Sequence, residues 1–128
     1  MRFVVQEHHA RTHHFDFRLE HADVYKSWAV PKGLPDRPGI RRLAIQVEDH
    51  DLAFGTFEGT IAEGEYGAGQ VAIWDQGDYV CREWGEDKIR IDLEGQKLKG
   101  EYGLIRTRHL GKRHWLIQKL RSAGEASR

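Results

Sequence analysis

Cysteine, proline and long apolar runs are all scarce in this chain of 128 residues. The single cysteine, Cys81, excludes an internal disulfide and any zinc site built from several thiolates. All three prolines lie between residues 31 and 38, so this stretch is expected to form an irregular loop. No apolar run reaches the ~18 residues of a membrane-spanning helix, and no signal-peptide pattern opens the chain. We therefore expect a cytoplasmic protein with no membrane partner.

The chain also lacks a net charge, because 20 basic residues balance 20 acidic ones. The two signs are unevenly distributed, with lysine and arginine in excess before residue 48 and after residue 95, and acidic residues in excess between them. A basic face of this kind can follow a phosphate backbone, and an ordinary solvated surface is the alternative. Charge alone does not decide between the two.

The length and the hydrophobic pattern predict one all-β domain with little helix. A chain of this size is long enough for a single hydrophobic core, which we place at residues 1–121, followed by a small polar tail at 122–128. Short segments that alternate between apolar and polar residues, separated by turn signals, are typical of an antiparallel barrel or sandwich. The expected strands are 2–7, 14–20, 24–30, 41–48, 57–61, 71–74, 79–84, 88–93, 98–106 and 114–120.

The alternation also predicts which side chains are buried and where turns lie. Seven apolar residues are expected to face the core: Phe15, Phe17, Leu43, Ile45, Val47, Val71 and Ile73. A turn is expected at residues 75–78, between two of the predicted strands. The glycine-rich segment 63–69 has no lysine in P-loop position and no following helix, so a nucleotide cradle is not expected there.

The most informative stretch is the strand predicted at residues 14–20. His14, Asp16 and Arg18 lie on its polar face, opposite Phe15 and Phe17. Histidine and aspartate are good ligands for a divalent cation, and a guanidinium suits a phosphate or a carboxylate. We therefore expect the functional site on the outer polar face of the sheet.

His8, six residues before His14, completes a three-ligand set if the intervening polar segment bends back. Such a set leaves coordination positions open for substrate or water, as catalytic metals require. His9 and His13 are expected to point elsewhere. The alternative is a histidine tract that binds metal adventitiously, but purification tags are runs of histidine without interleaved Phe, Asp and Arg.

Five short blocks of sequence resemble one known family. They are Gln6-x-His8, His14-x-Asp16-x-Arg18, residues 26–33 (Lys-Ser-Trp-Ala-Val-Pro-Lys-Gly), residues 47–50 (Val-Glu-Asp-His) and residues 57–59 (Phe-Glu-Gly). In this order they resemble the 3′-phosphoesterase domain of bacterial DNA ligase D, which also occurs as a free-standing protein. The likeness runs from about residue 3 to the end of the chain.

The resemblance implies a metal-dependent β-barrel enzyme of a prokaryotic cytoplasm that heals DNA 3′ ends in repair by end joining. The family removes a terminal ribonucleotide by phosphodiester cleavage and then the remaining 3′-phosphate. The implied cofactor is Mn²⁺, with Zn²⁺ or Co²⁺ as alternatives. The implied partners are DNA or RNA-tipped DNA 3′ ends and a separate ligase or polymerase.

The resemblance also assigns roles to individual residues. The metal ligands carry over to His8, His14 and Asp16. The resemblance places Gln6 in the polar shell around the site, in contact with the substrate phosphate. The catalytic and phosphate-contacting positions carry over to three cations and one histidine: Arg18, Lys32, Arg42 and His50. Chemistry supports these roles, since cations stabilise phosphoryl oxygens and a histidine with a pKa near ~6.5 suits a general acid or a transition-state donor.

The chain departs from the family pattern in two ways. The family usually has a charged segment ahead of its first strand, and this chain begins at that strand. The family also tends to have a tyrosine four residues after the histidine of the Glu-Asp-His block, where this chain has Phe54. Both departures predict that phosphomonoesterase activity is stronger than phosphodiesterase activity.

Two other classes of protein fit part of the pattern. A non-haem iron oxygenase also uses two histidines and a carboxylate on a β-barrel, although it needs less positive charge than this site has. A non-catalytic nucleic-acid-binding barrel would use the basic ends and the four tryptophans for backbone contacts and stacking. Such a binding protein has no need of a metal triad.

Overall fold

The computed structural model of the chain describes residues 1–65 and 68–121. Nine strands and two short 3₁₀ helices account for its regular structure, and no α-helix occurs in the described residues. The expected tail at 122–128 and two residues of the glycine-rich segment lie outside this part. The elements in order are β1 (Arg2–His9), β2 (His13–His21), β3 (Val24–Val30), β4 (Arg41–His50), η1 (Leu52–Thr56), β5 (Gly59–Ile61), β6 (Gly69–Trp84), β7 (Lys88–Glu94), β8 (Lys99–Arg106), η2 (Arg108–Leu110) and β9 (His114–Lys119).

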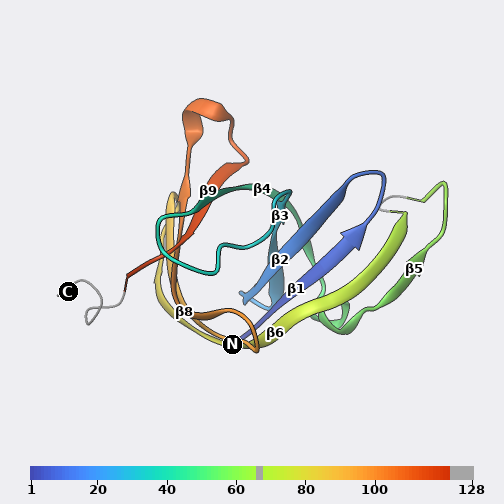
Figure 1. Cartoon of the computed structure of the whole chain (residues 1–128), viewed down its shortest axis with the longest axis horizontal. Helices are drawn as coiled ribbons and strands as arrows, with labels where there is room; N and C mark the ends of the chain where they lie inside the picture. The colour runs from blue at the N-terminus through green and yellow to red at the C-terminus, as the bar shows by residue number, and fades with distance from the viewer. Residues whose placement is uncertain (66–67, 122–128) are drawn as a thin grey trace.

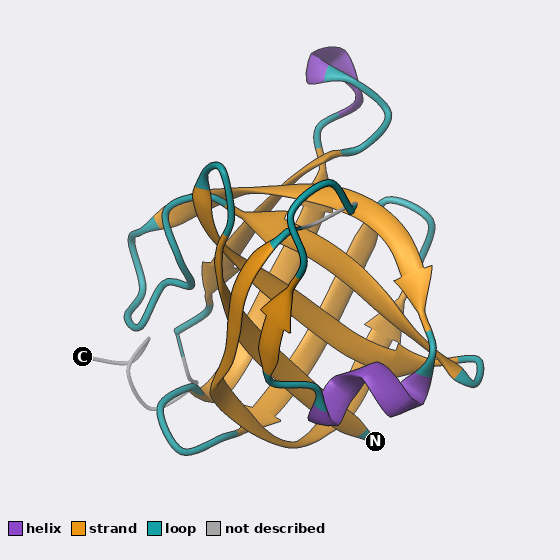
Figure 2. Cartoon of the chain, turned by 90° about the vertical axis from the view of Figure 1, so that its right-hand side faces the viewer, coloured by secondary structure: helices purple, strands orange, loops and turns teal. Residues whose placement is uncertain are grey.

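The strands form one antiparallel sheet that closes into a barrel (Figures 1 and 2). The strand order is β1-β2-β3-β4-β9-β8-β7-β6, and pairing of β1 with β6 closes the ring of eight. The short strand β5 pairs with β6 outside this ring. The all-β barrel predicted from the sequence is therefore confirmed. Within the described residues, no helix is long and apolar enough to cross a membrane.

Alternation places one face of each strand in the barrel interior. On β1 and β2, Phe3, Val5, Phe17 and Leu19 are fully buried in this core, together with Trp28 of β3. Side chains from β7, β8 and β9 complete it: Ile89, Ile91, Leu93, Tyr102, Leu104, Trp115 and Ile117. The opposite face of β1, β2 and β3 carries most of their buried polar residues, beside the apolar Val4 and Tyr25.

The predicted turn at residues 75–78 is wrong, because β6 continues from Gly69 to Trp84. The Asp75 carboxylate is buried and accepts the backbone N–H groups of residues 96, 97 and 98, so it stabilises the β7–β8 turn. Gly77 lies against the backbone of Glu94, where a Cβ atom would come within 2.1 Å of the carbonyl oxygen. Two residues typical of turns therefore serve close packing inside a strand.

The faces predicted for β4 are inverted. Leu43 is 37% exposed, Ile45 and Val47 are half-buried, and Ala44 is the fully buried residue. Ala44 lies opposite Trp115 of β9 in the strand pairing, and both residues are buried, so the small side chain and the indole share the core face. Of the other residues predicted to be buried, Phe17 and Val71 are buried, whereas Phe15 and Ile73 are only partly so.

Candidate active site

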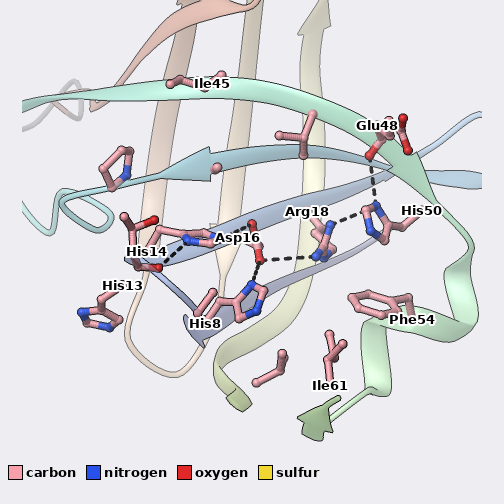
Figure 3. Close-up of a pocket in the computed structure, with 16 residues that line it drawn as sticks. His8, His13, His14, Asp16, Arg18, Ile45, Glu48, His50, Phe54 and Ile61 are labelled. Atoms are coloured by element: carbon pink, nitrogen blue, oxygen red, sulfur yellow. Dashed lines mark hydrogen bonds and ion pairs between the residues drawn. The ribbon is translucent and has the colours of Figure 1, made fainter. Parts of the chain in front are cut away.

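The pairing of β1 with β2 gathers the polar residues on the outer face of the barrel. Gln6 lies opposite Asp16, and His8 lies opposite His14. Cross-strand neighbours share a face, so these four side chains stand together, and Arg18 lies one strand repeat beyond Asp16. Figure 3 shows His8, His14, Asp16 and Arg18 directed toward one another.

The donor set expected for a metal is brought together. One ligand atom each of His8, His14 and Asp16 lies within 4.8 Å of the others. Nδ1 of His8 is 3.4 Å from Oδ2 of Asp16, and Nε2 of His14 is 3.3 Å from Oδ1. Nδ1 of His14 lies 3.2 Å from the carbonyl oxygen of Thr12, which orients the ring with Nε2 toward the carboxylate. Two imidazoles and one carboxylate fit a divalent transition-metal ion.

The charges of this group are strongly coupled. The hydrogen bond with Asp16 raises the pKa of His14, against the opposing effect of burial. Burial alone would raise the pKa of Asp16, but the hydrogen bond with His14 and the positive charge of Arg18 outweigh it and lower the pKa. The carboxylate is therefore ionised and able to bind a cation at neutral pH.

Arg18 is held by contacts on every side of its guanidinium. It is 4% exposed, and its Nε donates to Oε1 of Gln6 at 2.6 Å. Nη1 donates to Oγ of Ser27 at 2.9 Å, and Nη2 lies 3.5 Å from Oδ2 of Asp16. The planar group is therefore fixed in orientation beside the candidate metal ligands, as recognition of a phosphate requires.

His50, at the end of β4, contacts the same guanidinium. Its Nδ1 lies 3.2 Å from Nη1 of Arg18 and 3.0 Å from the carbonyl oxygen of Glu48. Burial and, next, the positive charge of Arg18 lower the pKa of His50. The ring is therefore neutral at neutral pH.

A strap covers this polar face. We define the strap as residues 51–61, which include η1 and β5. Gln6 donates from Nε2 to the carbonyl oxygens of Phe54 and Phe57, at 2.9 and 3.1 Å. The Phe54 ring lies 4.8 Å from the guanidinium carbon of Arg18. Gly55 is required here, because a Cβ atom would come within 2.5 Å of the Tyr25 ring.

Between the strap and the barrel lies a cavity of about 620 Å³. Asp16, Arg18 and His50 line its polar floor, and both side walls are apolar (Figure 3). Figure 3 shows Ile45 on one side of the cavity and Phe54 and Ile61 on the other. The lining has four further apolar residues: Ala29, Pro31, Val47 and Val71. A polar floor between apolar walls can hold a phosphate with a flat organic group attached.

Two residues predicted to contact phosphate do not line this cavity. Lys32 is exposed and follows Pro31 of the cavity wall. Arg42 pairs with Ile117 and so shares the inner face of the sheet, and its buried Nε has no hydrogen-bond partner. The structure brings together the other predicted site residues, namely Gln6, His8, His14, Asp16, Arg18 and His50.

Sequence reasoning missed Ser27 and the apolar walls. Ser27 is fully buried and lies opposite Arg18 in the β2–β3 pairing. A small hydroxyl residue beside Trp28, in a strand that is mostly apolar, was an available signal. For Ile45 and Val47, no signal separated a cavity wall from a core face, since both are apolar.

Comparison with known proteins gives the same family for most of the chain. The family model for the DNA Ligase D 3'-phosphoesterase domain matches residues 6–106. The multifunctional non-homologous end joining DNA repair protein LigD of Mycobacterium tuberculosis is 50% identical over 124 residues, which cover 94% of this chain and 16% of that protein. The multifunctional non-homologous end joining protein LigD of Pseudomonas aeruginosa is 47% identical over 133 residues, which cover 98% of this chain and 16% of that protein. The chain thus spans about a sixth of the length of these relatives.

Proposed function

The chain belongs to the DNA ligase D 3′-phosphoesterase domain family, and we propose that it is a divalent-metal-dependent phosphoesterase acting on DNA 3′ ends. Its substrates in this proposal are a 3′-phosphate and a 3′-terminal ribonucleoside, on strands that are to be joined. Residues 1–121 form the catalytic domain. A separate ligase or polymerase would then seal or extend the healed 3′-hydroxyl.

The observation that carries the proposal is the position of Arg18 between Asp16 and His50 on the floor of one cavity. A metal donor set, a fixed guanidinium and a histidine side by side match the needs of phosphoryl transfer, where negative charge must be neutralised on several oxygens. A divalent cation bound by His8, His14 and Asp16, most suitably Mn²⁺ and alternatively Zn²⁺ or Co²⁺, would polarise a phosphoryl oxygen. Arg18 would neutralise a second oxygen.

His50 has a role that follows from its two Nδ1 contacts. Nδ1 can accept from Arg18 or donate to the Glu48 carbonyl, but not both. The permanent charge of the guanidinium favours an accepting Nδ1, so the neutral ring carries its proton on Nε2. In this state His50 would donate a hydrogen bond from Nε2 to the leaving oxygen, whereas transfer of a proton to that oxygen would require the imidazolium form.

The apolar walls of the cavity would bind the nucleoside that leaves during phosphodiester cleavage. Phe54 and Ile61 on one side and Ile45 and Val47 on the other offer van der Waals contact to a ring system. A 3′-phosphate has no such group to position. Phosphomonoesterase activity would therefore depend mainly on the metal ligands and Arg18.

Lys32 and Arg42 remain predicted phosphate-contacting residues. Lys32 is exposed beside the cavity wall, where its ammonium would face a phosphate of the bound strand outside the cavity. Arg42 lies on the opposite sheet face, so any effect on turnover would be indirect. The variants Lys32→Ala and Arg42→Ala test these positions. Their turnover rates are compared with that of the wild type on DNA strands of increasing length. A contact with the DNA backbone outside the cavity affects only strands that are long enough to reach it.

The decisive experiment uses a 5′-labelled primer strand that ends in one ribonucleotide or in a 3′-phosphate. With Mn²⁺, we expect conversion of both ends to a 3′-hydroxyl, and loss of conversion in Asp16→Ala. Asp78→Ala is the matched control, because Asp78 is an exposed aspartate that pairs with Arg2. Conversion that survives Asp16→Ala or a chelator would refute the proposal. Oxygen consumption with iron and 2-oxoglutarate, without phosphate release, would favour an oxygenase instead.

A further inference from the structure

A second group of metal-ligand residues lies on the other side of the β1–β2 hairpin. Glu7, His9 and His13 each offer a ligand atom within 4.8 Å of the others. His9 lies opposite His13 in the pairing, one position beyond the His8–His14 pair. Adjacent residues of a strand point to opposite faces, so this group shares no ligand with the set His8, His14 and Asp16, although His13 also lines the cavity.

The group lies where strand β1 passes beyond the barrel core. Phe3 and Val5, on the same face of β1, are fully buried in the core. Further along this face, Glu7 is half-buried and His9 is exposed, so the strand has left the core by this point. Polar side chains at the mouth of the barrel therefore take the place that apolar ones occupy inside it.

The geometry converges on the Glu7 carboxylate. Nε2 of His13 lies 2.8 Å from Oε2 of Glu7, and Nε2 of His9 lies 3.4 Å from the same oxygen. The two imidazole rings stack with centroids 4.3 Å apart and planes inclined by 4°. Both rings thus direct the same nitrogen toward one oxygen, and the side chains are 28%, 57% and 48% exposed for Glu7, His9 and His13. An ion and its remaining water ligands have access to all three.

We propose that Glu7, His9 and His13 form a second site for a divalent transition-metal ion of the Zn²⁺ type, independent of the phosphoesterase site. Two imidazole nitrogens and one carboxylate oxygen are a donor set that such ions favour over Mg²⁺ or Ca²⁺. Small rotations about the side-chain torsions turn the parallel nitrogens and the carboxylate toward a common ion. The negative charge of Glu7 offsets part of the ion's charge.

The site would act on the loop between the two strands. His9 and His13 flank residues 10–12, and Ala10, Thr12 and His13 line the cavity. The carbonyl oxygen of Thr12 also contacts Nδ1 of His14. An ion that joins the two flanking histidines would close this loop and restrict the cavity wall at that end. The inferred role is structural support of the loop, and it does not depend on which substrate the cavity takes.

The test counts bound metal by titration of the purified chain with Zn²⁺, followed by gel filtration and elemental analysis. We expect two ions for the wild type and one for Glu7→Gln/His9→Gln. His109→Gln is the matched control, since it removes an exposed histidine of η2, and it should keep two. The variant Asp16→Asn weakens only the first site, so it should still bind one ion. The double variant Asp16→Asn/His13→Gln should bind none.

Histidine NMR signals give a second readout that does not depend on protein yield. In Asp16→Asn, Zn²⁺ should shift the ring signals of His9 and His13 and leave those of His21 and His109 in place. No ion bound by Asp16→Asn, two ions retained in Glu7→Gln/His9→Gln, or unchanged His9 and His13 signals would each overturn the proposal. Because no readout uses turnover, failure here is distinguishable from failure of the proposed phosphoesterase function.

Discussion

Nη1 of Arg18 lies 3.2 Å from Nδ1 of His50, and this contact joins the middle of β2 to the end of β4. The guanidinium also touches Gln6, Ser27 and Asp16, so it links the candidate metal ligands, the strap and the histidine. Any substitution at Arg18 should therefore affect several groups together.

Arg18→Lys should lower phosphomonoesterase activity by about one to two orders of magnitude. An ammonium cannot reproduce the fork of the guanidinium, and a hydrogen bond to a charged group is worth about 1.5–3 kcal/mol. The measurement is kcat/KM for release of a 3′-phosphate with saturating Mn²⁺. Arg82→Lys, at an exposed arginine of β6, is the control and should match the wild type. Near wild-type activity of Arg18→Lys would show that the guanidinium does not clamp phosphate.

His50 should titrate below its ordinary pKa of about 6.5, because burial and the Arg18 charge disfavour the imidazolium. As the pH falls, His50 is therefore protonated in the unfolded chain before it is protonated in the folded chain. The neutral ring therefore contributes stability above the ordinary pKa, and this contribution is lost as the pH falls through the lower folded-state value. NMR titration of the His50 ring checks the direction. Arg18→Met should raise the pKa, and an unshifted value would contradict the contact.

Metal affinity should weaken in acid through competition at His14. Its pKa is raised by the hydrogen bond to Asp16, so below that pKa a proton occupies the nitrogen that the metal requires. Each unit of pH below it should raise the Kd for Mn²⁺ about tenfold, since one proton is displaced. Calorimetry in buffers of different ionisation enthalpy measures the released proton directly. A Kd independent of pH in this range would exclude His14 as a ligand.

Phe54→Tyr should raise phosphodiesterase activity more than phosphomonoesterase activity. The Phe54 ring lies 4.8 Å from both the Arg18 guanidinium carbon and the His50 ring centroid, so a phenol here would add a donor at the cavity. A hydrogen bond to a charged group is worth about 1.5–3 kcal/mol, or roughly ten- to hundredfold in rate. The ratio of the two rates on matched strands is the readout. A ratio that does not change would show that Phe54 only packs.

The alternation of residues in the β1–β2 hairpin could be predicted from the sequence because its two faces differ in chemistry. His14, Asp16 and Arg18 alternate with large apolar residues, so the pattern of period two allowed one assignment of faces. His8 could be added because a hairpin brings residues on either side of its turn together. The strand β4 offered no such contrast, since Ile45 and Val47 line a cavity and Ala44 packs in the core.

The strap and the course of β6 were beyond reach of local patterns. The strap is held by the Gln6 side chain, whose partners Phe54 and Phe57 lie about fifty positions later in the chain. Asp75 and Gly77 resemble turn residues, and only their contacts with residues 94–98 explain their place in a strand. Local propensity gives way to such distant contacts.

Strand β1 supplies Gln6 and His8, and it has hydrogen-bonded neighbours on both sides, β2 and β6. Strand β2 follows β1 within a few residues. Strand β6 pairs with β1 across a sequence separation of up to 76 positions, from Arg2 to Asp78. Contacts between distant segments form slowly, because a long loop must close first. During synthesis, β1 must therefore wait until β6 has been made before its second edge is paired. The β1–β2 hairpin can bring the candidate metal ligands together early, but the barrel around them is completed only after β6 has been made.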